Sequence, residues 1–324
     1  MPTHTDSPSR GYVLALGDAN MDITGTPSVQ MRPCAAHPGA IRAKRGGCAR
    51  NAAENLARLG CDSRLLSVFG DDANGRALLQ ATAAAGVDLA ASLVLPATPS
   101  STSLIVYDAE GELFCSVGDI GIVGQLTPER LHAQAALIRG AELIVANTVL
   151  SVDALSWLFN HCGDRPLFID TVDGFLAPRI LPWLACVDTL KPNRAEASQL
   201  SGLPFGSREH AAPIADWFHH AGVRRVVLSL GQYGLYYSDG DLAGWLPPLP
   251  VDVVNVSGAG DALMAGLAYG RLEGMAFADS VRFGLGCAAL TLGGEDNNHP
   301  ALSPSAVRLL LQRAATPRTG APGA

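Results

Sequence analysis

The sequence predicts one α/β domain in which a mostly parallel central sheet is covered by helices on both faces and carries a small β lid. Short apolar runs that suit buried strands alternate with helical patterns along most of the chain. This alternation is typical of a parallel sheet with helices on both faces. Residues 24–45 and 100–120 interrupt it, and we expect them to form the lid.

The elements of the expected sheet can be assigned in order. A buried strand at residues 12–16 comes first, and a helix at 49–59 ends at Gly60. A strand at 65–68 precedes a helix at 75–85 that ends at Gly86, since glycine readily adopts the left-handed conformation that closes a helix. Further strands are expected at 143–146, 167–169, 226–229, 235–237 and 251–256, and further helices at 128–139, 151–162, 194–201, 208–221 and from 262 onward.

The two interrupting segments differ in pattern. Residues 102–118 predict a hairpin with its turn at 108–111, whereas residues 29–45 are polar, contain prolines and suggest a broken chain. A lid or a dimer contact is the expected role of the hairpin, and an ordinary edge of the main sheet is the alternative. With no internal repeat and no long linker, we expect one domain over residues 11–314, between disordered tails at 1–10 and 315–324.

Composition excludes several classes of function. The chain has 324 residues, is 48% hydrophobic and 16% charged, and carries a net charge of −7, so a large core is expected. Only two lysines occur, Lys44 and Lys191, and there is no basic stripe, which argues against nucleic acid or an anionic membrane as partners. The seven cysteines lack a CxxC pair and no apolar leader precedes the domain. We therefore expect reduced thiols and a cytoplasmic protein.

The turn Gly258-Ala259-Gly260-Asp261 is the strongest functional signal. It lies between an apolar run and a helical pattern, so the glycines allow close approach of a ligand and the helix start offers unpaired N–H groups to an anion. Asp261 in the same turn suits removal of a proton from a hydroxyl that attacks a phosphoryl group. The alternative is a plain strand-to-helix turn with an acid near the helix start.

Two further segments fit an acceptor that carries hydroxyl groups. Asn20 and Asp22 follow the first strand, two residues apart and so on one side of extended chain, where an amide and a carboxylate suit vicinal hydroxyls. Gly46 and Gly47 open the first helix, one turn before Asn51, and would let a ring approach closely. A polar turn and a glycine hinge are the alternatives.

Two segments fit a nucleotide. Asn193 and Glu196 share one helical face and suit a hydrated Mg²⁺, although the same pair forms a capping box in many helices. Ser229, Gly231 and Gly234 follow another strand and suit close approach of phosphate or ribose, with a simple turn as the alternative.

These segments occur in the order and with the spacing of the ribokinase, or PfkB, family of carbohydrate and nucleoside kinases, which the chain resembles from about Tyr12 to Leu311. The resemblance implies a ribokinase-like three-layer sandwich and ATP with Mg²⁺ as cofactors. Within the family the chain is most similar to the branch that phosphorylates the 5′-hydroxyl of pseudouridine, because of its segments 46–51, 189–194, 236–238, 255–261 and 280–283.

The resemblance also implies a role for each motif residue. Asp261 would be the base, and the N–H groups of Gly258, Ala259 and Gly260 would form the anion hole. The acceptor would be bound by Asn20, Asp22, Gly46, Gly47 and Asn51. The nucleotide would be bound by Asn193, Glu196, Ser229, Gly231, Gly234 and Asn297, with Asn193 and Glu196 holding Mg²⁺ through water. A homodimer formed through the lid is also implied.

One departure from the family pattern concerns a monovalent cation. Many members have an aspartate where this chain has Asn255, and an amide lacks the charge, so K⁺ activation is not carried over. The alternatives are another kinase of this family, acting on ribose, uridine, adenosine or inosine, and a nucleoside-binding protein without catalysis. A Rossmann dehydrogenase is disfavoured because no GxGxxG follows the first strand.

Overall fold

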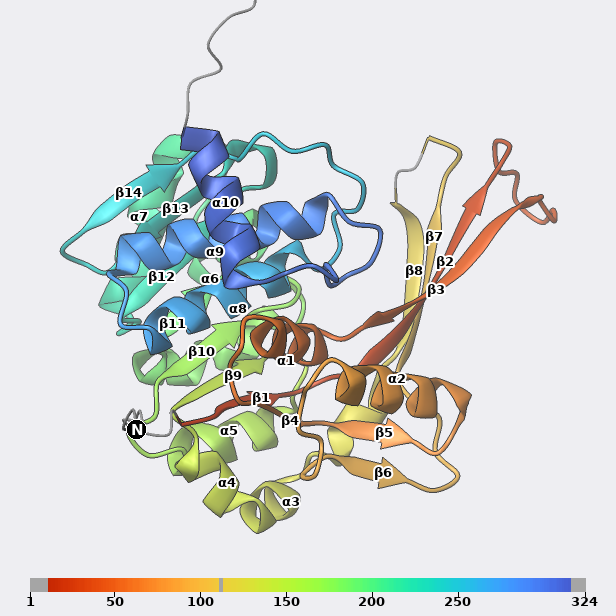
Figure 1. Ribbon diagram of the computed structural model, residues 1–324, viewed down its shortest axis with the longest axis horizontal. Coiled ribbons are helices and arrows are strands. Elements are labelled where there is room, and N and C mark those ends of the chain that lie inside the picture. Colours follow the sequence, from red (N-terminus) through yellow and green to blue (C-terminus); the bar gives the residue numbers. More distant parts are fainter. Residues whose placement is uncertain (1–10, 111–112, 316–324) are drawn as a thin grey trace, which may run out of the picture.

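The computed structural model describes residues 11–110 and 113–315 of the chain, and its centre is a single sheet of eight described strands (Figure 1). From one edge to the other, the order is β14-β13-β12-β11-β10-β9-β1-β4. The strands β4, β1, β9, β10, β11 and β12 run parallel, and β13 pairs antiparallel with both β12 and β14. The bounds are β1 Val13–Leu16, β4 Ser63–Leu66, β9 Leu143–Asn147, β10 Leu167–Asp170, β11 Thr189–Lys191, β12 Arg225–Ser229, β13 Leu235–Ser238 and β14 Ala243–Leu246.

Helices cover both faces of this sheet. One layer holds α1 (Cys48–Arg58), α8 (Ala259–Leu272), α9 (Phe277–Leu292) and α10 (Pro304–Ala315). The other holds α3 (Pro128–Ala133), α4 (Ala135–Gly140), α5 (Val152–His161), α6 (Arg194–Ser201) and α7 (Ala211–His220). Successive residues of a strand pack alternately into the hydrophobic cores on the two faces of the sheet, as Val13 and Leu14 do. Burial on both faces explains the continuous apolar runs, and the predicted three-layer fold is confirmed.

A smaller sheet projects from the body on the right of Figure 1. Its order is β3-β2-β7-β8, with β2 at Asn20–Pro27, β3 at Gly39–Gly46, β7 at Thr102–Tyr107 and β8 at Leu113–Asp119. The two strands of the predicted hairpin are present as β7 and β8, and Gly111 of its predicted turn lies outside the described residues. We call this sheet the lid sheet. Beside it, α2 (Ala73–Ala84) packs on β5 (Val68–Gly70), which pairs with β6 (Leu93–Leu95).

The prediction of a broken chain at residues 29–45 is wrong for its last part, where β3 pairs with β2 from Asn20↔Gly46 to Pro27↔Gly39. Most residues of β3 are exposed, so polar side chains are tolerated on this strand and conceal its pattern. Similarly, the predicted strand at 65–68 is divided between β4 and β5, on different sheets.

The apolar run at 251–256 forms no strand, contrary to prediction. The N–H groups of Val254 and Asn255 instead donate to the carbonyl of Leu292, at the end of α9. At the C-terminus, Ala315 belongs to α10 rather than to a tail, and the other predicted tail residues lie outside the described part of the chain. No helix in the described part is long and apolar enough to cross a bilayer.

Candidate active site

Polar side chains gather at the carboxyl ends of the parallel strands. Asp18 follows β1, Asn147 ends β9, Asp170 ends β10 and Lys191 ends β11. All four are buried, with exposed fractions of 7% or less. Parallel strands end at one edge of a sheet, where open α/β proteins bind their ligands. The sheet therefore brings these polar groups together although they are far apart in sequence.

The glycine turn starts α8 at this edge. Gly258 has φ of +81°, and a Cβ on it would lie 1.9 Å from the carbonyl oxygen of Asn297. Glycine is therefore required at this position. No side chain caps the helix start among the described residues, so the N–H groups of Ala259 and Gly260 have no side-chain partner there. Such an uncapped helix start can bind an anion.

Asp261 lies in the first turn of α8 and is 7% exposed. Its Oδ2 accepts a 2.6 Å hydrogen bond from Nδ2 of Asn51. The pKa of Asp261 is raised to about 7, chiefly by burial and next by the negative charge of Asp170, while the Asn51 bond and the positive Lys191 act in the opposite direction. A carboxylate that titrates near neutral pH is suited to accept a proton in a reaction.

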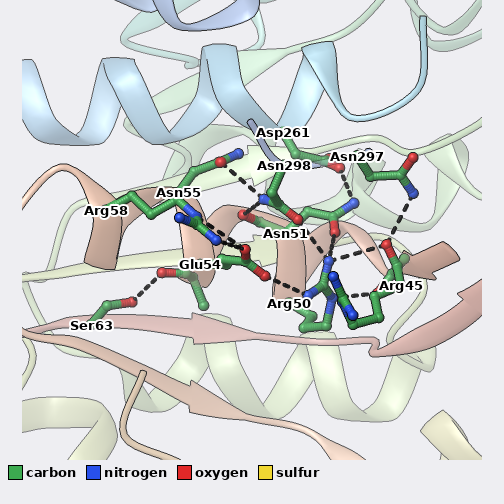
Figure 2. A network of polar contacts seen from close by, with 12 residues as sticks. Arg45, Arg50, Asn51, Glu54, Asn55, Arg58, Ser63, Asp261, Asn297 and Asn298 are labelled. Carbon is green, nitrogen blue, oxygen red and sulfur yellow. Dashed lines mark hydrogen bonds and ion pairs between the residues drawn. The ribbon is translucent and has the colours of Figure 1, made fainter. Parts of the chain in front are cut away.

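The orientation of the Asn51 amide is fixed by Arg50 (Figure 2). Arg50 is 1% exposed and donates to five acceptors: the carbonyls of Gly46 and Arg45, and the side chains of Asn51, Glu54 and Asn298. Because the guanidinium only donates, it holds the Asn51 oxygen, and the Asn51 nitrogen is then directed at Asp261. Nδ2 of Asn298 in turn donates to the backbone oxygen of Asn51 at 2.9 Å.

A buried carboxylate fixes the start of α1. Asp18 accepts the N–H groups of Cys48 and Ala49, each at 3.2 Å, and a 2.7 Å bond from Nδ2 of Asn147. Gly47 precedes the helix with φ of +91°, and a Cβ there would lie 2.6 Å from Cα of Ala19. Close contact between the start of α1 and the residues that follow β1 therefore requires glycine. This contact sets the position of Asn51, which lies one turn into α1.

Asn20 and Asp22 lie on β2 with their side chains in contact. Asp22 accepts Nδ2 of Asn20 at 2.5 Å and Nδ2 of Asn297 at 3.0 Å, and burial raises the pKa of Asp22. Asn20 is 5% exposed, yet its Oδ1 has no hydrogen-bond partner among the described residues. Since buried polar atoms are normally paired, this oxygen indicates a ligand that donates a hydrogen bond, such as a hydroxyl group.

Asn193 and Glu196 form the capping box that was the alternative reading. Asn193 caps α6 by accepting the N–H of Glu196 at 3.0 Å, and the Glu196 carboxylate accepts the N–H of Asn193 at 2.8 Å. Thr171 Oγ1 and Asn193 Nδ2 also donate to Glu196, each at 2.5 Å. With its oxygens occupied by these donors, Glu196 fits contact with a metal through water rather than direct coordination.

The third nucleotide segment adjoins this capping box. Ser229 forms a β-bridge with Asn193, and its N–H donates to the carbonyl of Pro192 at 3.0 Å. Gly231 begins a short 3₁₀ turn that ends before Gly234. The structure therefore groups these residues on the Asn193 side of the site.

Asn297 lies beside residues of the acceptor side. Its amide donates to Asp22 and to the carbonyl of Arg45, so its side chain is placed with the acceptor-side residues rather than with Ser229 and Asn193. The assignment of Asn297 to the nucleotide site stays a prediction.

Sequence reasoning missed Lys191. Nζ of Lys191 is 3.1 Å from Oδ2 of Asp170 and 3.3 Å from the position of a Cβ on Gly260. Burial lowers the pKa of Lys191, but the carboxylates of Asp170, Glu196 and Asp261 raise it by more, so the amine stays charged. Its place in segment 189–194, one of those that carry the family resemblance, in a chain with only two lysines, was an available signal.

Comparison with known proteins identifies the family. The model of the pfkB family of carbohydrate kinases matches residues 10–302. The chain belongs to this family. It is 40% identical to the pseudouridine kinase of Escherichia coli strain K12 over 306 residues, which cover 94% of this chain and 98% of that enzyme.

Solved structures agree with the family assignment. A carbohydrate kinase from Agrobacterium tumefaciens is 26% identical and superposes with a TM-score of 0.79, over 93% of this chain and 97% of that one. The ribokinase of Arabidopsis thaliana, solved with ribose and ATP, is 21% identical with a TM-score of 0.80, over 93% and 99% of the two chains. The protein is therefore a carbohydrate kinase with the ribokinase-like fold.

Proposed function

We propose that this kinase transfers the γ-phosphoryl group of ATP to the 5′-hydroxyl of pseudouridine, giving pseudouridine 5′-phosphate and ADP. The observation that carries the reaction type is the buried Asp261, whose pKa is about 7, beside the uncapped start of α8. The choice of acceptor is supported by 40% identity to a pseudouridine kinase over 94% of the chain.

In this proposal Asp261 accepts the proton of the 5′-hydroxyl as its oxygen attacks the γ-phosphorus. The bond from that phosphorus to the bridging oxygen breaks, and ADP leaves. The N–H groups of Gly258, Ala259 and Gly260 hold the phosphoryl oxygens, where preorganised donors stabilise the developing charge. Lys191, whose Nζ is beside Gly260, adds a positive charge at the same place.

The acceptor side binds the ribose. The unpartnered Oδ1 of Asn20 accepts a ribose hydroxyl, and Asp22 accepts another. Gly46, Gly47 and Asn51 form the neighbouring wall of the acceptor site. Asn51 also holds the carboxylate of Asp261. Two such hydroxyl acceptors orient the ribose so that its 5′-oxygen faces Asp261, and orientation is a major source of rate in phosphoryl transfer.

The nucleotide side is formed by Asn193, Glu196, Ser229, Gly231 and Gly234. Asn193 and Glu196 would hold Mg²⁺ through water, a mode that Mg²⁺ favours. When bound, Mg²⁺ offsets the charge of the phosphates.

A monovalent cation is not part of this proposal. Oδ1 of Asn255 accepts the N–H of Ser257 at 3.2 Å, and its Nδ2 donates to the carbonyl of Glu295. Turnover in KCl and in NaCl should therefore agree within about twofold, and a strict requirement for K⁺ would contradict this.

We also propose a homodimer through the outer face of the lid sheet and residence in the cytoplasm. Ile41, Leu104 and Val117 share that face and are 81%, 47% and 68% exposed, an apolar surface that suits a second copy. All seven cysteines are free, in keeping with a reducing compartment. Sedimentation of wild type and Val117→Glu tests the dimer, because the variant should be monomeric.

Coupled ADP release tests the function. ATP–Mg²⁺ is supplied with pseudouridine, uridine, adenosine, inosine or ribose, and kcat/KM is compared. Highest kcat/KM with pseudouridine supports the proposal. Highest kcat/KM with another acceptor supports the kinase assignment but contradicts pseudouridine as the substrate. No ADP release with any acceptor supports a nucleoside-binding protein without catalysis.

A further inference from the structure

A cavity of about 500 Å³ lies between the lid sheet and the loop 253–257, a volume within the roughly 300–1,000 Å³ usual for small-molecule sites. Asp22 and Asn297 line it at the end near the ribose-binding residues, and Thr24, Arg42 and Tyr107 line it farther out. The cavity is therefore continuous with the acceptor site and extends outward along β2.

The walls of the outer part suit a flat ring. Side chains from alternate positions of the lid sheet face the cavity, including Ile105 and Tyr107, which are half-buried. On the opposite side, Val253 and Val256 are 59% and 71% exposed although they are apolar. A planar base between these two apolar walls would cover both, a favourable burial of apolar surface.

The polar groups in the outer part lie as a pair. Thr24 and Arg42 are directly opposite each other on β2 and β3, so both side chains project from the same face of the sheet, about 5 Å apart at Cβ. Thr24 is two residues beyond Asp22 on the strand, about 6.5 Å farther from the centre of the site. This separation corresponds to the step from a ribose to its base.

The hydroxyl of Thr24 is set up as an acceptor. Oγ1 of Thr24 donates to the backbone carbonyl of Arg42 at 3.4 Å. With its hydrogen directed there, its lone pairs remain available to accept a bond. The guanidinium of Arg42 can only donate, and it has no hydrogen-bond partner among the described residues.

On the basis of the proposed nucleoside substrate, we infer that this pair reads the base: Thr24 Oγ1 accepts a ring N–H, and Arg42 donates to the carbonyl beside it. Pseudouridine presents an N1–H next to a carbonyl, whereas uridine presents a C–H when its ring takes the same orientation. Thr24 therefore selects pseudouridine over uridine, because a C–H leaves the acceptor unpaired.

The test compares wild type with Thr24→Val, Thr24→Ser and Thr26→Val. For each, kcat/KM is measured with pseudouridine and uridine, or the inhibition constant where there is no turnover. Thr24→Val should lower the preference for pseudouridine over uridine by roughly tenfold or more. Thr24→Ser keeps the hydroxyl and should retain the preference. Thr26→Val changes the next residue on the same face and should leave it within about twofold.

The outcomes separate this inference from the proposed function. A wild type that prefers pseudouridine, with an unchanged ratio in Thr24→Val, overturns the base-reading pair alone. A wild type that neither phosphorylates nor binds either nucleoside overturns the proposed function, and the base-reading pair with it. Arg42→Met adds a second measure, since it should lower kcat/KM for both nucleosides and leave that for ribose unchanged.

Discussion

The side chains of Asn51 and Asp261, which are 210 positions apart in the chain, meet in a 2.6 Å hydrogen bond. Asn51 comes from the first turns of α1 and Asp261 from the first turn of α8. The bond therefore joins the segment assigned to the acceptor with the segment assigned to the phosphoryl group. It also stabilises the charged form of Asp261 and so opposes the effect of burial on the pKa.

The rate should follow the titration of Asp261. Only the ionised carboxylate accepts a proton, so kcat/KM should rise with pH up to about 7 and level off above it, with about a tenfold change per pH unit on the acidic side. Initial rates at saturating ATP between pH 5 and 9 measure this. A profile that is flat down to pH 5 would mean that Asp261 titrates much lower or is not the base.

The free energy of unfolding should also depend on the titration of Asp261, but it should fall with rising pH where the rate rises. The folded pKa of about 7 is above the reference value of 3.8, so between these values the folded state binds a proton that the unfolded state has lost. The contribution of Asp261 to the stability of the folded state is fully present below pH 4 and is lost as pH rises through 7. Asp261→Asn should therefore raise the free energy of unfolding at pH 8 by on the order of 2 kcal/mol. Urea unfolding at pH 8 and pH 5 measures the difference, which should shrink at pH 5.

Arg50 should act through Asn51, as a positioning residue. Arg50→Lys keeps a charge for Glu54 but cannot reach all the present acceptors, so the Asn51 amide is released and kcat should fall by roughly tenfold to a hundredfold. The acidic limb of the pH profile should move upward, because the Asn51 bond lowers the pKa of Asp261.

Arg58→Lys is the matched control for Arg50. Arg58 pairs with the same Glu54, at 2.7 Å, and also donates to the carbonyl of Pro300. This variant should keep kcat and the pH profile of wild type. If Arg50→Lys lowers the free energy of unfolding together with kcat, and the acidic limb of the pH profile does not shift, the role of Arg50 is structural.

Lys191 should influence both the phosphoryl group and the base. Lys191→Met removes a buried positive charge that lowers the pKa of Asp261, so the acidic limb should move to higher pH and kcat should fall. Lys191→Arg restores the charge and should return the limb toward wild type. A limb that stays in place in Lys191→Met would show that Lys191 serves only as the partner of Asp170.

Local signals predicted the fold and part of the site. Most strands of the main sheet are buried on both faces, so their apolar runs are unmistakable, whereas β14 is exposed or half-buried and was missed. The turn at Gly258 needs glycine for a local reason, its positive φ. β3 was missed because an exposed strand tolerates polar residues. Arg50 and Asn298 could not be paired from sequence, since 248 positions separate them and neither belongs to a periodic pattern.

Glu196 shows why a local pattern can be ambiguous. Its spacing from Asn193 fits both a capping box and a hydrated metal, and the structure contains the capping box. The placement of Asn297 beside Asp22 depends on how the loop after α9 folds back over β2 and β3. Neither outcome could be decided without tertiary contacts.

The most direct test of the central claim is single-turnover phosphorylation of pseudouridine by wild type and Asp261→Asn, with the product examined by phosphorus NMR. Calorimetry of both ligands accompanies it. Wild type should form a phosphate coupled to the 5′-methylene protons, and the variant should bind both ligands yet react at least ~10²-fold more slowly. Near-wild-type turnover in Asp261→Asn, or a phosphate on another hydroxyl, would contradict the account.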